Sequence, residues 1–206
     1  NLDGVSVNNS QFVKKNYNTN ETWGGRAALK IDLDDNWTIT PAAIYQEQRA
    51  KGSFGYDPQV GDLRLQHFYP EYRRERFIQA ALTIEGKIGN WDMTYAGAYL
   101  DRTTASSTDY TDYSEAYDSL YASVGGLANY FYYLDNAGAT IDPRQKVLAT
   151  DHFKKLSQEI RVASPQDERF RVVAGAFYQR QSNLIHQDYQ IPNLGADVSV
   201  NGSPGT

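Results

Sequence analysis

"WDMTYAGAY" (residues 91–99) is the stretch that decides the fold. Successive side chains of an extended chain point to opposite faces, so Trp91 and Tyr99 share one face with small or apolar residues between them. Two other segments have the same form, "WTITPAAIY" (37–45) and "FRVVAGAFY" (170–178). Each begins with an aromatic ring just after a turn-like stretch and carries a Tyr eight positions later. The repeat predicts three strands, each with one aromatic and apolar face.

Each of these strands has a partner just before it in the chain. "WGGRAALKIDL" (23–33), "FIQAALTIEGKI" (77–88) and "SQEIRVAS" (157–164) alternate in the same way, and short turns at 34–36, 89–90 and 165–168 connect them to the three returning strands. The pattern is typical of β-hairpins. The other face of these strands is polar and carries Arg26, Lys30, Asp32, Gln79, Glu85, Glu159 and Arg161.

The aromatic spacing fits the thickness of a membrane. Eight residues at roughly 3.3 Å each span about 26 Å of strand, which a tilt of about 40° reduces to roughly 20 Å of height. Aromatic rings gather at both membrane interfaces of such barrels. We therefore expect a transmembrane strand face with six interface residues: Trp37, Tyr45, Trp91, Tyr99, Phe170 and Tyr178.

A soluble antiparallel sheet with one buried face alternates in the same way, so connection lengths are needed to separate the two folds. The three turns are short, whereas the connections at 50–75, at 101–154 and from 181 onward are long. Short turns at one end and long loops at the other are typical of outer-membrane barrels. We predict an all-β fold: an antiparallel, up-and-down transmembrane β-barrel fragment of about six strands, with long extracellular loops.

Composition excludes several other classes. The chain of 206 residues has no Cys and a net charge of −5, which leaves no thiolate metal site or disulfide and no general surface for nucleic acid. No apolar run reaches the roughly 18 residues of a membrane-spanning helix. Both ends have the character of cuts, so we expect a piece of a longer protein.

Three segments resemble the barrel of TonB-dependent receptors: "NYNTNETWGGRAALKIDLDDNWTITP", "HFYPEYRRERFIQAALTIEGKIGNWDMTYAGAYLDR" and "LSQEIRVASPQDERFRVVAGAFYQRQ". The resemblance extends over about residues 12–187. It implies a barrel closed by an N-terminal plug in the outer membrane of a Gram-negative bacterium. It also implies uptake of a scarce nutrient, such as an iron–siderophore complex, powered by a TonB-type energy coupler. Residues 1–206 resemble only the barrel domain of these receptors. We therefore expect the plug domain and the C-terminal closing strands to be absent.

The longest connection contains candidate ligand-binding residues. Tyr residues recur at helical spacing in "TDYTDYSEAYDSLYASVGG" (108–126), which predicts a short amphipathic helix ended by Gly125 and Gly126. Tyr supplies contact area and a hydroxyl at low entropy cost, although loop tyrosines also pack on neighbouring loops. With two arginines that precede a strand, the candidates are Tyr110, Tyr113, Tyr117, Tyr121, Tyr130, Tyr132, Arg73 and Arg74.

No metal, cofactor or catalytic site is expected. The acids Asp109, Asp112, Glu115 and Asp118 form a solvated face of the predicted helix rather than a calcium loop. His67, His152 and His186 lie too far apart to form a paired-ligand motif, and enzyme motifs are missing. Two alternatives stay open: a secreted β-sandwich module that binds carbohydrate, and an outer-membrane barrel enzyme with a catalytic group at its rim.

Overall fold

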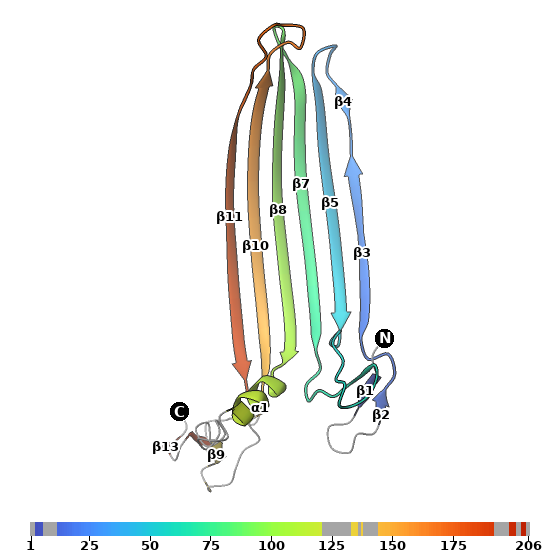
Figure 1. Ribbon diagram of the computed structural model, residues 1–206, viewed down its shortest axis with the longest axis vertical. Coiled ribbons are helices and arrows are strands. Elements are labelled where there is room, and N and C mark those ends of the chain that lie inside the picture. The colour runs from blue at the N-terminus through green and yellow to red at the C-terminus, as the bar shows by residue number, and fades with distance from the viewer. Residues whose placement is uncertain are drawn as a thin grey trace.

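The computed structural model describes residues 3–5, 12–120, 133–135, 137, 144–191, 198–200 and 203–204. Its main feature is a seven-stranded antiparallel sheet (Figure 1). Six long strands lie side by side in the order β11-β10-β8-β7-β5-β3, and the short β4 pairs with β5. The all-β, antiparallel fold predicted from the sequence is therefore confirmed. Among the described strands the sheet is open, with β11 and β3 at its two edges.

The long strands are β3 (Thr19–Ala28), β5 (Thr38–Lys51), β7 (Tyr72–Ile88), β8 (Trp91–Asp109), β10 (Lys146–Ala163) and β11 (Val173–Gln190). The short ones are β1 (Asp3–Val5), β2 (Phe12–Lys14), β4 (Ile31–Asp32), β6 (Arg64–Leu65), β9 (Tyr133–Asp135), β12 (Val198–Val200) and β13 (Ser203–Pro204). Helix α1 (Thr111–Leu120) follows β8. The three predicted hairpins are confirmed as β3–β5, β7–β8 and β10–β11.

Local chemistry sets the tight turns. Gly89 has a φ of 64° in the two-residue turn between β7 and β8, a conformation that glycine adopts without steric cost in such hairpins. Between β4 and β5, the Asp34 carboxylate accepts hydrogen bonds from the backbone N–H groups of Asn36 and Trp37 at 2.8 and 2.9 Å. The third turn is longer than the predicted 165–168, because β11 begins only at Val173.

The strands are longer than the alternation predicted. The expected connections at 50–75, at 101–154 and from 181 onward are wrong in their bounds, because strand pairing continues to Lys51, Asp109 and Gln190. Strand β8 alone contains 19 residues. Beyond the apolar stretch both sides of each strand are polar. The strands continue there through backbone hydrogen bonds, but the sequence no longer alternates between polar and apolar residues. The connections remain long, at 52–71 and 110–145.

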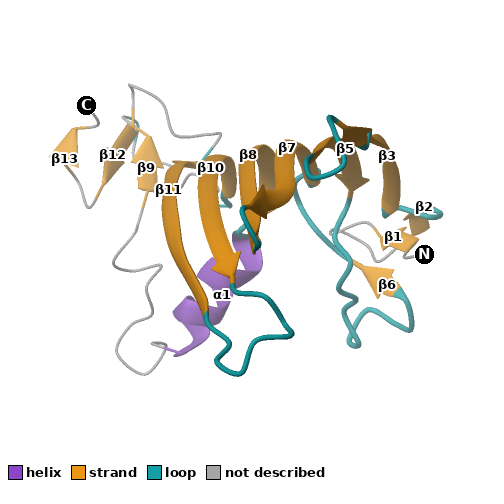
Figure 2. Cartoon of the chain, turned by 90° about the horizontal axis from the view of Figure 1, so that it is seen from above, coloured by secondary structure: helices purple, strands orange, loops and turns teal. Residues whose placement is uncertain are grey.

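The register defines two faces of the sheet. Residues directly opposite each other in paired strands share a face. We call one of them the Tyr99 face; Tyr99 pairs there with Ala80 of β7 and Leu156 of β10. The next residue, Leu100, belongs to the opposite face. Helix α1 and β6 lie on one side of the curved sheet (Figure 2).

This sheet has almost no protein core of its own. Leu65 and Val147 are the buried hydrophobic residues of the described part of the chain. Each pair of described elements in extensive contact is a pair of hydrogen-bonded neighbours, so no second layer of described strands packs across the main sheet.

Candidate functional site

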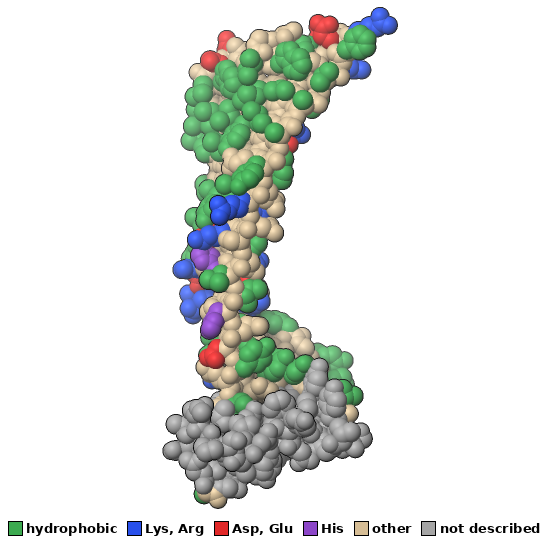
Figure 3. All heavy atoms as spheres, turned by 90° about the vertical axis from the view of Figure 1, so that its left-hand side faces the viewer, with side chains coloured by type: hydrophobic (Ala, Val, Ile, Leu, Met, Phe, Trp, Pro, Cys, Tyr) green, Lys and Arg blue, Asp and Glu red, His purple; other side chains and the backbone are tan. Residues whose placement is uncertain are grey.

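The Tyr99 face is apolar in the half next to the short turns. Its side chains in this half come from five long strands and are predominantly apolar; we call them the apolar band: Ile39, Pro41, Ala43, Tyr45, Ile78, Ala80, Leu82, Ile84, Met93, Tyr95, Tyr99, Leu156, Ile160, Val162, Ala174, Ala176 and Tyr178. Tyr178 is 57% exposed, Ile78 50% and Ile160 44%. Figure 3, which faces the β11 edge, shows hydrophobic side chains gathered near the short-turn end.

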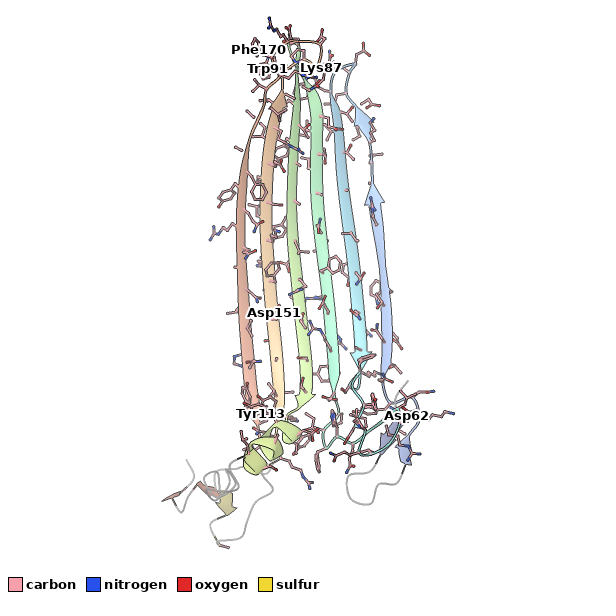
Figure 4. The ribbon with its side chains drawn as sticks, in the orientation of Figure 1. Asp62, Lys87, Trp91, Tyr113, Asp151 and Phe170 are labelled. Carbon is pink, nitrogen blue, oxygen red and sulfur yellow. The ribbon has the colours of Figure 1, made fainter. Side chains whose placement is uncertain are left out.

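Aromatic rings lie near both limits of this band. Trp91 starts β8 at the short-turn end, where Figure 4 also places Phe170. At the other limit Tyr45 packs against Trp23, with 5.3 Å between ring centroids. Tyr99 lies on β8 near the same limit, and Tyr178 pairs with Gln158 of β10.

Two of the predicted interface residues precede their strands. Trp37 comes just before β5, and its ring lies over Gly86 of β7, where a Cβ atom would overlap it. Phe170 lies in the turn between β10 and β11, so strand alternation does not apply to it as the sequence predicted. The hydrogen bond from the Val172 N–H to the Ser164 hydroxyl closes that turn, and β11 begins at the residue after Val172.

The opposite face is polar beside the same turns. Thr94 of β8 pairs there with Glu85 of β7 and with Arg161 of β10. Arg161 also forms an ion pair with Glu159 at 2.9 Å. Beside the short turns the sheet is therefore amphipathic, with one apolar face and one charged face.

Further from the turns, the Tyr99 face becomes charged. An open hollow of about 560 Å³ lies there, and its lining includes Arg49, Arg74 and Arg76. Arg74 is a predicted ligand-binding residue, but its neighbour Arg73 belongs to the opposite face and pairs with Glu75 at 3.0 Å. The structure therefore separates the two arginines that the sequence grouped together.

The predicted loop helix is present as α1, and its first tyrosines pack on other rings. Tyr110, just before the helix, lies 4.5 Å from Tyr113 and 5.5 Å from Tyr189 of β11, measured between ring centroids. Tyr189 belongs to the opposite face, so the chain packs on that face where it enters α1. The predicted end at Gly125 and Gly126 lies outside the described residues, as do Tyr121, Tyr130 and Tyr132, and the side chain of Tyr117 is likewise not described.

A cluster at the loop end joins the connection 52–71 to β8 and α1. His67 Nδ1 lies 2.7 Å from a Glu71 oxygen, and His67 Nε2 lies 3.8 Å from a carboxylate oxygen of Asp112. The Asp109 carboxylate accepts hydrogen bonds from the N–H groups of Phe68 and Tyr69, at 2.5 and 3.0 Å. Asp109 therefore lies at the end of β8 and holds the backbone amides of the connection 52–71. Its predicted position on the solvated face of a helix is wrong.

Charge and burial act against each other in this cluster. Burial lowers the pKa of His67, but the hydrogen bond and charge of Glu71, with the charges of Asp109 and Asp112, outweigh it and raise the pKa above its ordinary value. Burial also opposes ionisation of Asp109. The hydrogen bonds that Asp109 accepts nevertheless hold its pKa below the ordinary range. The sequence carried one sign of this cluster, the spacing of four between His67 and Glu71.

Within the described ranges, no group of His, Asp and Glu residues is placed to hold a metal ion. No described helix is long and apolar enough to span a membrane. No protein-family model matches the sequence, and no curated protein is similar to it.

Proposed function

We propose that this chain forms part of the wall of a transmembrane β-barrel in an outer membrane. More narrowly, we propose the ligand-binding and transport wall of a TonB-dependent receptor that imports a scarce nutrient, such as an iron–siderophore complex. The observation that carries the proposal is the apolar band, whose side chains are half-buried or exposed and which no second layer of described strands covers. Soluble proteins rarely leave so large a contiguous apolar surface open to water.

The position of the loops supports a barrel. The three connections within the hairpins lie at one end of the sheet, and the long connections lie at the other (Figure 1). At the loop end, Tyr110, the residue before α1, packs against Tyr189 on the opposite face. In a barrel this face lines the lumen, where outer loops fold inward. The arrangement leaves the Tyr99 face free for lipid.

The sheet edges support a larger assembly. Strands β3 and β11 each have one neighbour in the main sheet. Unpaired backbone groups are too costly inside a bilayer, which admits strands only as closed barrels. Further strands must therefore complete the wall. On this proposal, ligand uptake and the TonB-type partner belong to the complete receptor with its plug.

The identity of the receptor rests on the resemblance of the three quoted segments, which correspond to the three hairpins. No further observation favours an enzyme or a β-sandwich. A sandwich module would bury the apolar band against a second sheet, so the environment of that band discriminates between the two.

A pair of neighbouring cysteines tests the proposal. Ile160 belongs to the Tyr99 face and Arg161 to the opposite face, and the chain has no Cys to interfere. We would introduce Ile160→Cys and Arg161→Cys separately into the complete protein, attach an environment-sensitive fluorophore and reconstitute each variant in vesicles. We expect blue-shifted emission at position 160 that brominated lipid quenches, and emission at position 161 that it does not quench. Equal quenching by aqueous iodide at both positions would reject the membrane wall.

A further inference from the structure

The hollow on the Tyr99 face is built from two adjacent rows of paired residues. One row runs Glu47, Arg76, Thr103, His152 and Leu184 across five strands, and the next runs Arg49, Arg74, Ala105, Thr150 and His186. All ten line the hollow. Thr103, Ala105 and Thr150 are small and form the middle, whereas long basic side chains rise on one flank and histidines on the other. The register therefore creates a depression with three arginines along one side.

The charge of the hollow is opposite to that of the chain. Three arginines and two acidic residues, Glu47 and Asp151, line it, which leaves one net positive charge, in a chain of net charge −5. Arg49 is held by Glu47 at 2.6 Å, and Arg76 donates to the Thr103 hydroxyl at 3.0 Å. His152 contacts Asp101 at 3.0 Å.

Of the three arginines in the hollow, Arg74 has the most hydrogen-bond donors left for a ligand. Among the residues that the structure describes, its guanidinium forms no ion pair within 4 Å, although it stands beside Arg49 and close to Arg76 in the register and its charge acts on the Glu47 carboxylate. Adjacent guanidinium groups repel one another unless an anion lies between them. Arginine binds phosphate oxygens through paired N–H groups, so a phosphate group matches the charge and the donors of this hollow.

The hollow also directly borders the apolar band. The neighbouring row toward the turns contains Tyr45 and Ile78 from that band, and adjacent side chains on one face are two residues apart, about 7 Å along a strand. In Figure 3 the basic and histidine side chains follow the hydrophobic ones toward the loops. A molecule with apolar chains on the band would place its polar head in the hollow.

We propose that the hollow binds a phosphate group of an anionic membrane lipid, with Arg74 and Arg76 as the main phosphate ligands. The proposal rests on the proposed function, because it needs the apolar band to face a membrane. The lipid's acyl chains lie on the band, and its phosphate lies between Arg74 and Arg76 in the hollow. A soluble anion would neutralise the positive charge but would make no contact with the adjacent apolar surface.

The test uses a matched pair of arginines. Arg74→Gln removes a cation from the hollow, and Arg73→Gln removes one from the opposite face at the next position. The complete protein would be placed in nanodiscs of neutral lipid doped with a bisphosphorylated glycolipid, and lipid retained after detergent extraction would be counted by native mass spectrometry. We expect Arg74→Gln to reduce retention at least about tenfold, Arg74→Lys to recover part of it, and Arg73→Gln to match the unsubstituted protein.

Three outcomes would overturn the inference. One is equal retention in the Arg74→Gln and Arg73→Gln variants. Another is equal retention of the dephosphorylated glycolipid. The third is binding of inorganic phosphate in lipid-free micelles that depends on Arg74 and is as tight as binding of the lipid, which would identify a soluble anion as the occupant. The fluorophore at position 160 separates this failure from that of the proposed function, because it reports lipid contact whatever occupies the hollow.

Discussion

At the scale of single residues, the contact of Trp37 with Gly86 shows how side chains pack on the Tyr99 face. The indole ring lies where a Cβ atom at Gly86 would be, so the missing side chain makes room for the aromatic one. An aromatic ring that covers a glycine on a neighbouring strand is a known stabilising device in sheets. Alternation alone predicted Trp37 as an interface residue, but it could not reveal what the ring packs against.

We predict that Gly86→Ala destabilises the protein by about 1–3 kcal/mol, because the added methyl group overpacks the site and displaces the Trp37 ring. Gly25→Ala is the matched control, since it belongs to the same face and a Cβ atom there meets nothing within 4 Å. Urea unfolding in micelles, followed by tryptophan fluorescence, measures both. Equal midpoints for the two variants would contradict the packing argument.

At the scale of elements, the cluster around His67 ties the connection 52–71 to β8 and to the start of α1. Since the folded protein raises the pKa of His67, the cluster is strongest when the imidazole is charged. Its stabilisation is fully present below the unfolded value of about 6.5 and is lost as pH rises through the folded value. Asp109 has a lowered pKa, so its contribution holds above about 3.9 and disappears in stronger acid.

We therefore predict that the segment 66–71 exchanges its amide hydrogens faster at pH 8 than at pH 6, after correction for the intrinsic rate. His67→Gln should remove this difference, because glutamine keeps a hydrogen-bond donor but no titrating charge. Hydrogen exchange with mass spectrometry measures it, and peptides from the middle of β8 serve as the internal control. A pH dependence that survives in His67→Gln would assign it to another group.

The elements also show what the sequence could and could not predict. Where one face is apolar, as from Ile78 to Ile84, alternation and turn residues predict strands, pairing and faces correctly. Near Asp101 both faces turn polar and the pattern disappears, although β8 continues to Asp109. The hollow joins residues far apart in the chain that only the register brings together, and the His67 cluster depends on how the connection 52–71 folds against the end of β8.

At the scale of the whole molecule, the two ends of the sheet differ in kind. Asp35 lies in a tight turn, whereas Tyr113 lies in α1 at the far end of the long strands (Figure 4). Strands of 17 to 19 residues in β7 and β8 extend roughly 56–63 Å at about 3.3 Å per residue. That length exceeds the apolar band, so on the proposed function the charged half and the loops stand outside the bilayer on one side.

This asymmetry predicts which end meets the outside of the cell. We expect Tyr113→Cys in the complete protein to react with a membrane-impermeant maleimide on intact cells, and Asp35→Cys to react only after lysis, because on the proposed function the short turns face the periplasm. Both side chains are exposed, so a difference in reactivity reports the membrane barrier rather than burial. Each variant labelled after lysis gives its own reference. Labelling of Asp35→Cys on intact cells would show that the orientation is the reverse of the one proposed. Equal labelling of both variants in a soluble fraction would show that the apolar band belongs to a protein core.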